Sequence, residues 1–188
     1  MNNLKSGFVS IVGRSNVGKS TLLNRIIGEK ISIISNKPQT TRFNLKLIYN
    51  SLDSQIIFVD TPGVQNPKNK LGEFMLKESK NSLKDVDLIL YMVDSNLEIG
   101  ELDNKIIDIL EKINLPKICV INKIDTLNSE DLSKIILKYE DINLFDKIIP
   151  ISASEGTNVY NLIDSIKSFL PFGPRYYSDD MITDLTER

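Results

Sequence analysis

The chain has 188 residues, 41% of them hydrophobic, which is enough for one substantial core and one main domain. Its 23 basic and 25 acidic residues leave a net charge of -2, which does not favour a large nucleic-acid footprint. The sequence has no histidine and a single cysteine, Cys119, so internal disulfides, cysteine-cluster metal sites and histidine-dependent catalysis are excluded. Any chemistry must use carboxylates, lysine, backbone amides and a hard metal ion.

Short apolar runs alternate along the chain with amphipathic segments of helix length. This alternation is typical of an α/β fold, in which helices cover both faces of a mostly parallel sheet. The expected strands are residues 7–12, 43–49, 55–60, 87–94, 117–121 and 147–151. The expected helices are residues 19–27, 71–83, 101–112, 129–139 and 157–170.

A phosphate-binding loop is predicted directly after the first expected strand, where the sequence matches G-x-x-x-x-G-K-[ST] and opens a helix. Its glycines let the backbone approach a diphosphate, so that N–H groups and the helix N-terminus point at the phosphate oxygens. We expect Lys19 to reach the β- and γ-phosphates and the Ser20 hydroxyl to bind Mg²⁺. The motif comprises Gly13, Arg14, Ser15, Asn16, Val17, Gly18, Lys19, Ser20 and Thr21.

Residues 31–42 are expected to form a loop that closes over the γ-phosphate. Such a loop needs a hydroxyl ligand for Mg²⁺, and the adjacent Thr40 and Thr41 are the threonines it contains. We favour Thr41, with Thr40 as the alternative. Lys37 and Arg42 are equally compatible with an ordinary solvated surface.

A second phosphate-sensing segment, D-x-x-G, starts with Asp60 and continues with Thr61, Pro62 and Gly63. The Asp60 carboxylate can hold a water on Mg²⁺, and the Gly63 amide can donate to a γ-phosphate. In Ras-like GTPases the next residue is a glutamine that orients the attacking water, whereas this chain has Val64. A valine side chain forms no hydrogen bond, so we expect slow intrinsic hydrolysis.

The motif N-K-x-D predicts that the base is guanine. Guanine presents N1–H and an N2 amine on one edge, and the Asp125 carboxylate can accept from both, whereas adenine offers no such pair of donors. We expect Asn122 to brace the loop and contact the base edge, and the stem of Lys123 to cover the ring face. Ser152 and Ala153 follow a later strand, where a backbone N–H can donate to the guanine oxygen.

Together the motifs predict a P-loop NTPase fold of the Ras-like G-domain type, with a six-stranded sheet, that binds GTP or GDP with Mg²⁺. Lys19, Thr41 and Gly63 are the expected catalytic residues, with Ser20, Thr41 and Asp60 around the metal. Two alternatives stay open. One is a P-loop ATPase or phosphotransferase, and the other is a non-hydrolysing module that docks on a partner when guanine nucleotide is bound.

The apolar periodicity stops after Leu170 at Pro171, Phe172, Gly173 and Pro174. We therefore expect a domain over residues 1–171 and a linker over residues 172–188 that leads to a further domain. Residues 1–5 lack the features of a signal peptide, and no apolar run approaches the ~18 residues that span a bilayer. A cytoplasmic location is expected.

The motif order resembles the translation-factor-related class of GTPases, and more narrowly the Era family of bacterial ribosome-assembly GTPases. The resemblance is carried by residues 13–24 (GRSNVGKSTLLN), 39–42 (QTTR) and 170–180 (LPFGPRYYSDD). It implies a role in small-subunit assembly and 16S rRNA maturation, with RNA bound by a KH domain for which this chain has no residues. It also implies peripheral association with the inner face of the cytoplasmic membrane. Related GTPases with a hydrophobic residue at the position of Val64 use K⁺, held partly by an asparagine that Asn16 matches.

Overall fold

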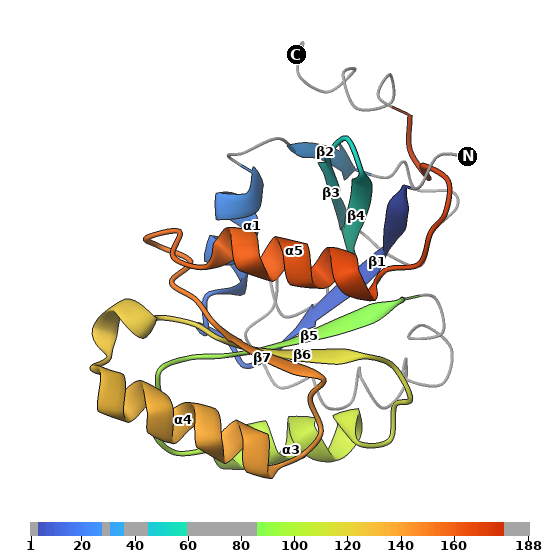
Figure 1. The fold of residues 1–188 in the computed structure, drawn as a ribbon. Coiled ribbons are helices and arrows are strands. Elements are labelled where there is room, and N and C mark those ends of the chain that lie inside the picture. The colour runs from blue at the N-terminus through green and yellow to red at the C-terminus, as the bar shows by residue number, and fades with distance from the viewer. Residues whose placement is uncertain (1–3, 28–30, 36–44, 60–85, 179–188) are drawn as a thin grey trace.

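The computed structural model describes residues 4–27, 31–35, 45–59 and 86–178. Its centre is a seven-stranded sheet with the strand order β2-β3-β4-β1-β5-β6-β7 (Figure 1). The strands are β1 (Lys5–Val12), β2 (Ile31–Ser35), β3 (Leu45–Asn50), β4 (Ser54–Val59), β5 (Leu88–Val93), β6 (Lys117–Ile121) and β7 (Lys147–Pro150).

The expected α/β fold class is confirmed, because the strand pairs from β4 through β7 are all parallel. The sheet has one strand more than the six expected. The additional strand is β2, which pairs antiparallel with β3, as β3 does with β4. The expectation of a loop over residues 31–42 is wrong for residues 31–35, because three isoleucines in five residues favour a strand and β-branched residues fit a pleated sheet.

Four α-helices lie in the described segments: α1 (Lys19–Ile27), α3 (Glu101–Leu110), α4 (Ser129–Asp141) and α5 (Val159–Phe169). Helices α1 and α5 lie on one side of the sheet, and α3 and α4 lie on the other (Figure 1). The helix expected over residues 71–83 falls outside the described residues. Within the described segments, no helix has both the length and the apolar character that a membrane crossing requires.

Two hydrophobic clusters hold these layers together, one on each face of the sheet. Leu22 and Ile26 of α1 and Leu162 and Ile166 of α5 pack in the first cluster. The second cluster contains buried residues of α3 and α4. Every residue of β5 is buried, as expected for a central parallel strand. Burying each such aliphatic side chain contributes roughly 1.5–3 kcal/mol.

The four parallel strands β1, β5, β6 and β7 place the loops that follow them at one edge of the sheet. In open parallel sheets, ligands bind in the crevice outside the carboxyl ends of the strands. The phosphate-loop motif follows β1, the N-K-x-D motif follows β6, and Ser152 and Ala153 follow β7. The fold therefore collects motifs that are more than 100 residues apart in sequence.

Candidate nucleotide-binding site

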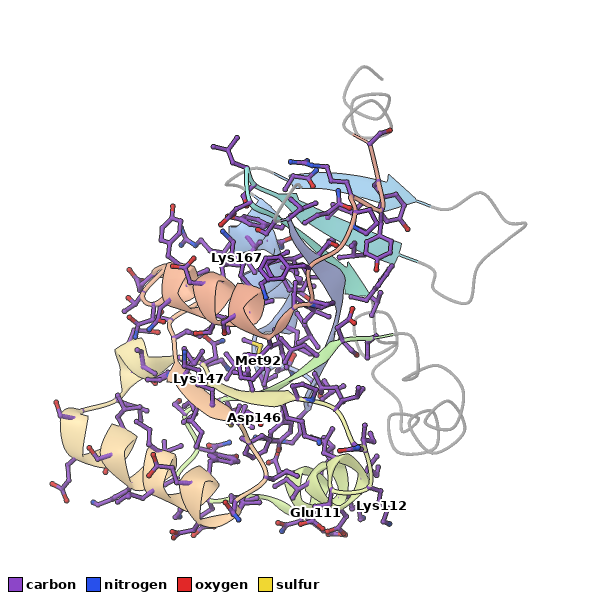
Figure 2. The ribbon with its side chains drawn as sticks, turned by 45° about the vertical axis from the view of Figure 1, so that its right-hand side comes forward. Met92, Glu111, Lys112, Asp146, Lys147 and Lys167 are labelled. Carbon is purple, nitrogen blue, oxygen red and sulfur yellow. The ribbon has the colours of Figure 1, made fainter. Side chains whose placement is uncertain are left out.

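Two glycines allow the loop after β1 to lie directly against neighbouring backbone and side chains. Gly13 has φ +155°, and a Cβ atom there would lie 2.2 Å from the Met92 carbonyl oxygen. Gly18 has φ +104°, and its Cβ would lie 2.1 Å from Asn122 Nδ2. Met92, labelled in Figure 2, belongs to the core cluster beneath α5. Neither position has room for a side chain, so the loop must carry glycine at both.

Lys19 is a buried ammonium held inside this loop. It is 6% exposed, and its Nζ donates to the carbonyl oxygen of Gly13 at 2.6 Å and to that of Arg14. Burial, together with the nearby positive charge of Arg14, lowers the pKa of Lys19 to about 8. A phosphate would give this cation an anionic partner in place of neutral carbonyls, and charge-assisted hydrogen bonds are the stronger kind.

The Arg14 side chain is engaged on the other side of the loop. Its Nε lies 2.8 Å from Asp103 Oδ2, and its Nη2 lies 3.1 Å from Asp94 Oδ1. The buried Asp103 carboxylate also accepts from the Tyr91 hydroxyl at 3.0 Å and from the Gly100 amide at 3.3 Å. Arg14 therefore anchors the loop to the N-terminus of α3. Because its guanidinium already faces two carboxylates, Arg14 is poorly placed to act as an arginine finger, an arginine that stabilises charge on a transferring phosphoryl group.

The remaining side chains of the motif divide into a buried one and several exposed ones. Val17 is fully buried in the core, whereas Ser15, Asn16, Ser20 and Thr21 are exposed. Ser20 is the second residue of α1, where main-chain N–H groups have no partner within the helix. This is a suitable position for a hydroxyl that faces a phosphate-bound metal.

Asn122 connects the phosphate loop to the loop after β7. Its Nδ2 donates to the Val17 carbonyl oxygen at 2.8 Å, and its Oδ1 accepts from the Ala153 amide at 2.9 Å. Asn122 is 2% exposed, so neither bond competes with bulk water. These two bonds hold the two loops together. Of the backbone N–H groups expected near the guanine oxygen, that of Ala153 already has an acceptor here.

A second bridge comes from Lys123, which has a left-handed backbone conformation with φ +64°. Its Nζ donates to the carbonyl oxygen of Asn16 at 2.8 Å, so the aliphatic stem spans from the N-K-x-D motif to the phosphate loop. Asn16 is itself left-handed, with φ +65°. The stem is long and apolar enough to cover the face of a ring.

The specificity carboxylate expected at Asp125 is exposed and oriented by a hydroxyl. Ser152 Oγ donates to Asp125 Oδ1 at 2.5 Å, and Ser152 Oγ itself accepts from the Glu155 amide at 3.2 Å. The hydroxyl fixes the direction of the carboxylate without neutralising it. Asp125 is thus placed to accept from a base with two adjacent donors.

The metal site is described in part. Of the three predicted ligands, Ser20 lies in a described segment, whereas Thr41 and Asp60 lie outside it, as do Thr40, Thr61, Pro62, Gly63 and Val64. In the described segments no group of three or more histidine, cysteine or acidic residues forms a metal cluster. One protein hydroxyl beside a phosphate cradle fits Mg²⁺, which keeps several waters and shares phosphate oxygens.

Two side chains at this site were missed by sequence reasoning. Asp103 is 89 positions from its partner Arg14, and Arg25 of α1 donates to carbonyl groups in the loop after β7, 128 positions away. Neither residue belongs to a short motif. The available signal was the position of Asp103 in the first turn of a helix, which equally suits an ordinary interaction with the helix dipole.

Comparison with known protein families gives a match over most of the chain. The sequence model of the family described as 50S ribosome-binding GTPase matches residues 8–123. The chain is 53% identical to the GTPase Era of Alkaliphilus metalliredigens over 184 residues, which are 98% of this chain and 62% of that protein. The GTPase Era of Clostridioides difficile is likewise 53% identical, over 185 residues. The chain spans 62% of the length of these relatives.

Solved structures of Era are also similar to this chain. A crystal structure of Era in complex with MgGDPNP and nucleotides 1506–1542 of 16S ribosomal RNA is 41% identical and superposes with a TM-score of 0.75. It is matched over 97% of this chain and 62% of that one. A variant of Aquifex aeolicus Era bound to GDP and AlF₄⁻ is 41% identical with a TM-score of 0.74 and the same coverage.

Proposed function

Because this chain belongs to the GTPase family described as 50S ribosome-binding GTPases, and within it to the Era type, we propose that it binds GTP with Mg²⁺ and hydrolyses it to GDP and phosphate. The observation that carries the proposal is the Asn122 junction. One buried side chain bonds the phosphate loop at Val17 and the base loop at Ala153, so that two recognition elements act as one site.

In this proposal the residues of the chain mainly bind and stabilise charge. Lys19 leaves the carbonyl oxygens of the loop and donates to the β- and γ-phosphates, while Ser20 and the first amides of α1 contact the metal and phosphate oxygens. When bound, Mg²⁺ neutralises charge on the transferring phosphoryl group. Thr41, Asp60 and Gly63 are proposed to complete the site and to respond to loss of the γ-phosphate.

The test of guanine specificity is binding of labelled GDP to the chain and to Asp125→Asn, with ADP and xanthosine diphosphate as competitors. We expect the substitution to weaken GDP binding and to favour xanthosine diphosphate, because an amide presents a donor where the carboxylate accepts. If ADP competes as well as GDP, the P-loop ATPase or phosphotransferase alternative is supported. GTP that stays intact after long incubation with Mg²⁺ would support the non-hydrolysing module.

A potassium ion is proposed as a further cofactor, because Val64 has no hydrogen bond to offer the attacking water. Support comes from the position of Asn16 in the phosphate loop and from its exposed side chain. The test compares GTP turnover in potassium and sodium buffers for the chain and for Asn16→Ala. Turnover that is faster in potassium, and loses that preference in the variant, is expected. Equal rates in both salts would remove potassium from the mechanism.

For the longer protein we propose a role in assembly of the small ribosomal subunit and maturation of 16S rRNA. A relative is solved with the 16S segment bound, and that protein is longer than this chain. With a net charge of -2, this chain is not expected to supply the main RNA contact, which we assign to a KH domain after residues 172–188. The test measures binding of an RNA covering nucleotides 1506–1542 to this chain and to the full-length protein.

A cytoplasmic location goes with this role, since the proposed ligands are cytoplasmic. No described feature supports peripheral contact with the inner face of the membrane, which was implied by resemblance alone.

Binding of this chain to the RNA as tight as that of the full-length protein would contradict the assignment of RNA recognition to a further domain.

A further inference from the structure

We propose that Arg25 is a positioning residue for guanine recognition, holding the loop after β7 in its base-binding shape from the helix that begins at the phosphate loop. The proposal rests on guanine nucleotide binding as proposed above. It adds a residue that lies outside the nucleotide motifs, in the last turn of α1, and assigns it to the base rather than to the phosphates.

The Arg25 guanidinium makes two hydrogen bonds to consecutive carbonyl groups of that loop. Its Nε donates to the Ala153 oxygen at 3.1 Å, and its Nη2 donates to the Ser154 oxygen. The guanidinium also lies over Gly156, since a Cβ at this glycine would be 3.7–3.8 Å from its atoms. Gly156 has φ +83°, a conformation that strongly favours glycine, and its amide closes the turn by donating to the Ser152 oxygen at 2.8 Å.

Holding these carbonyl groups sets the direction of the amides that follow them. A trans peptide unit is planar, and its C=O and N–H point in opposite directions. Fixing the Ala153 oxygen against Arg25 therefore fixes the Ser154 N–H so that it points away from Arg25. Fixing the Ser154 oxygen does the same for the Glu155 N–H, which donates to Ser152 Oγ at 3.2 Å.

The same loop is held on its other side by the residues already described. The Ala153 amide is bound to Asn122, and Ser152 orients the Asp125 carboxylate. The loop after β7 is thus held by Arg25 of α1 on one side and by Asn122 and the Ser152–Asp125 contact on the other. We take the Ser154 N–H as the donor to the guanine oxygen, because the Ala153 amide is bound to Asn122. Without Arg25, the peptide between Ala153 and Ser154 can rotate, and this N–H loses its direction.

The contact also links base recognition to phosphate recognition through one rigid element. Arg25 lies six residues after Lys19 in α1, or roughly 9 Å along the helix axis. Its contacts are polar and the loop is largely exposed, with Ser154 and Glu155 at the surface. Removing the Arg25 side chain therefore takes little apolar area out of the core, and its main effect is expected on the ligand.

The test compares Arg25→Ala and Arg25→Lys with the unchanged chain. Two ligands are titrated: GDP, and the 5′-diphosphate of 2-aminopurine riboside, which keeps the 2-amino group but lacks the guanine oxygen and the N1–H. The matched control is Arg175→Ala, which removes an arginine that donates to a carbonyl, that of Ser51, at the far end of the sheet. Melting temperatures of all variants are recorded.

We expect Arg25→Ala to raise the Kd for GDP about tenfold and to change the Kd for the 2-aminopurine nucleotide less than twofold. Arg25→Lys, which keeps one donor, should recover part of the loss, and Arg175→Ala should bind both ligands normally. The proposal is overturned if GDP binding is unchanged, or if both ligands weaken by the same factor, as a general loosening of the fold would cause. An unchanged chain that does not prefer GDP to ADP would instead refute the proposed function.

Discussion

Asn122 is the residue on which the joining of the two loops most depends. Its amide satisfies a carbonyl oxygen and an amide in the buried interior, and removing it leaves both without this partner. A buried unsatisfied polar group costs about 1–3 kcal/mol. We expect Asn122→Ala to lower the free energy of unfolding by this amount and to weaken GDP binding, measured by denaturant titration and calorimetry.

A matched control for this prediction is Asn128→Ala. Asn128 is the N-cap of α4, and its side chain accepts from the Asp131 amide at 2.8 Å at the surface. Loss of an N-cap costs about 1 kcal/mol. The control should therefore lose stability but retain GDP affinity. If both asparagine variants bind GDP equally well, the junction is not needed for recognition.

Lys19 predicts a pH dependence of nucleotide binding. Its pKa is lowered to about 8 in the free loop, mainly by burial, and an adjacent phosphate raises the pKa again. Binding above pH 8 must therefore take up a proton. GDP affinity should be constant below about pH 8 and fall as the pH rises above it. Calorimetry at pH 9 in two buffers of different ionisation enthalpy measures the uptake, which should vanish in Lys19→Met.

For single residues, local motifs in the sequence point to candidate site residues. They do not predict side-chain contacts between segments that are far apart in the sequence. From the N-K-x-D motif we expect Asn122 to brace the loop and contact the base edge, but the motif does not name the Val17 and Ala153 groups that its amide bonds. The ion pair of Arg14 with Asp103 was not expected, because it depends on how α3 lies relative to the phosphate loop. No periodicity or motif in one sequence encodes that arrangement.

At the scale of elements, one buried side chain contributes three of the hydrogen bonds that hold the polar segment after α5. Gln55, at the start of β4, is fully buried. Its Oε1 accepts from the amides of Tyr176 and Tyr177 at 2.7 and 3.1 Å, and its Nε2 donates to the Tyr177 oxygen at 2.9 Å. Lys167 of α5, labelled in Figure 2, lies 3.1 Å from Asp53 at the same end of the sheet.

We expect Gln55→Leu to release this segment without affecting the nucleotide site at the opposite end of β1. The substitution removes three hydrogen bonds to the segment and a fourth that Gln55 Nε2 donates to Asn50 Oδ1 at 2.8 Å, each worth about 0.5–1.5 kcal/mol. The groups of the segment lie near the surface, where water can reach them. Trypsin should cleave faster after Arg175, and the amides of residues 176 and 177 should exchange faster with deuterium. Ser51→Ala is the control, because its hydroxyl bonds Asp53 and Ser54 but not the segment. Unchanged cleavage would show that Gln55 does not hold the segment.

Among the elements, the buried parallel strands were the easiest to predict. The apolar run of β5 is continuous, and the expected range 87–94 exceeds the observed strand by one polar residue at each end. Strand β2 lies within the segment 31–42, in which two adjacent threonines favour a loop that closes over a phosphate. The first five residues of that segment also have a strong local preference for a strand, because three of them are isoleucine. The expected boundary at residue 171 stays a prediction.

For the whole molecule, the hydrogen bonds and ion pairs of Asn122, Arg25 and Arg14 connect the ligand site to several strands and helices of the domain. Strands β1, β5, β6 and β7 and helices α1 and α3 each contribute or position a part of it. A ligand that binds this site in the folded chain, but not in the unfolded chain, must stabilise the whole domain. At a concentration of 100 times Kd the stabilisation is about 2.7 kcal/mol.

For a domain of this size, such stabilisation corresponds to a rise in melting temperature of roughly 5–11 °C. We expect GDP with Mg²⁺ to produce this rise in a thermal melt, and ADP at the same concentration to leave the melting temperature unchanged. Asp125→Asn should lose most of the response to GDP, because that carboxylate accepts from two donors that guanine has and adenine lacks. An equal rise with ADP would mean that the phosphate loop alone supplies the stabilisation, and that the groups held by Asn122 and Arg25 do not distinguish one base from another.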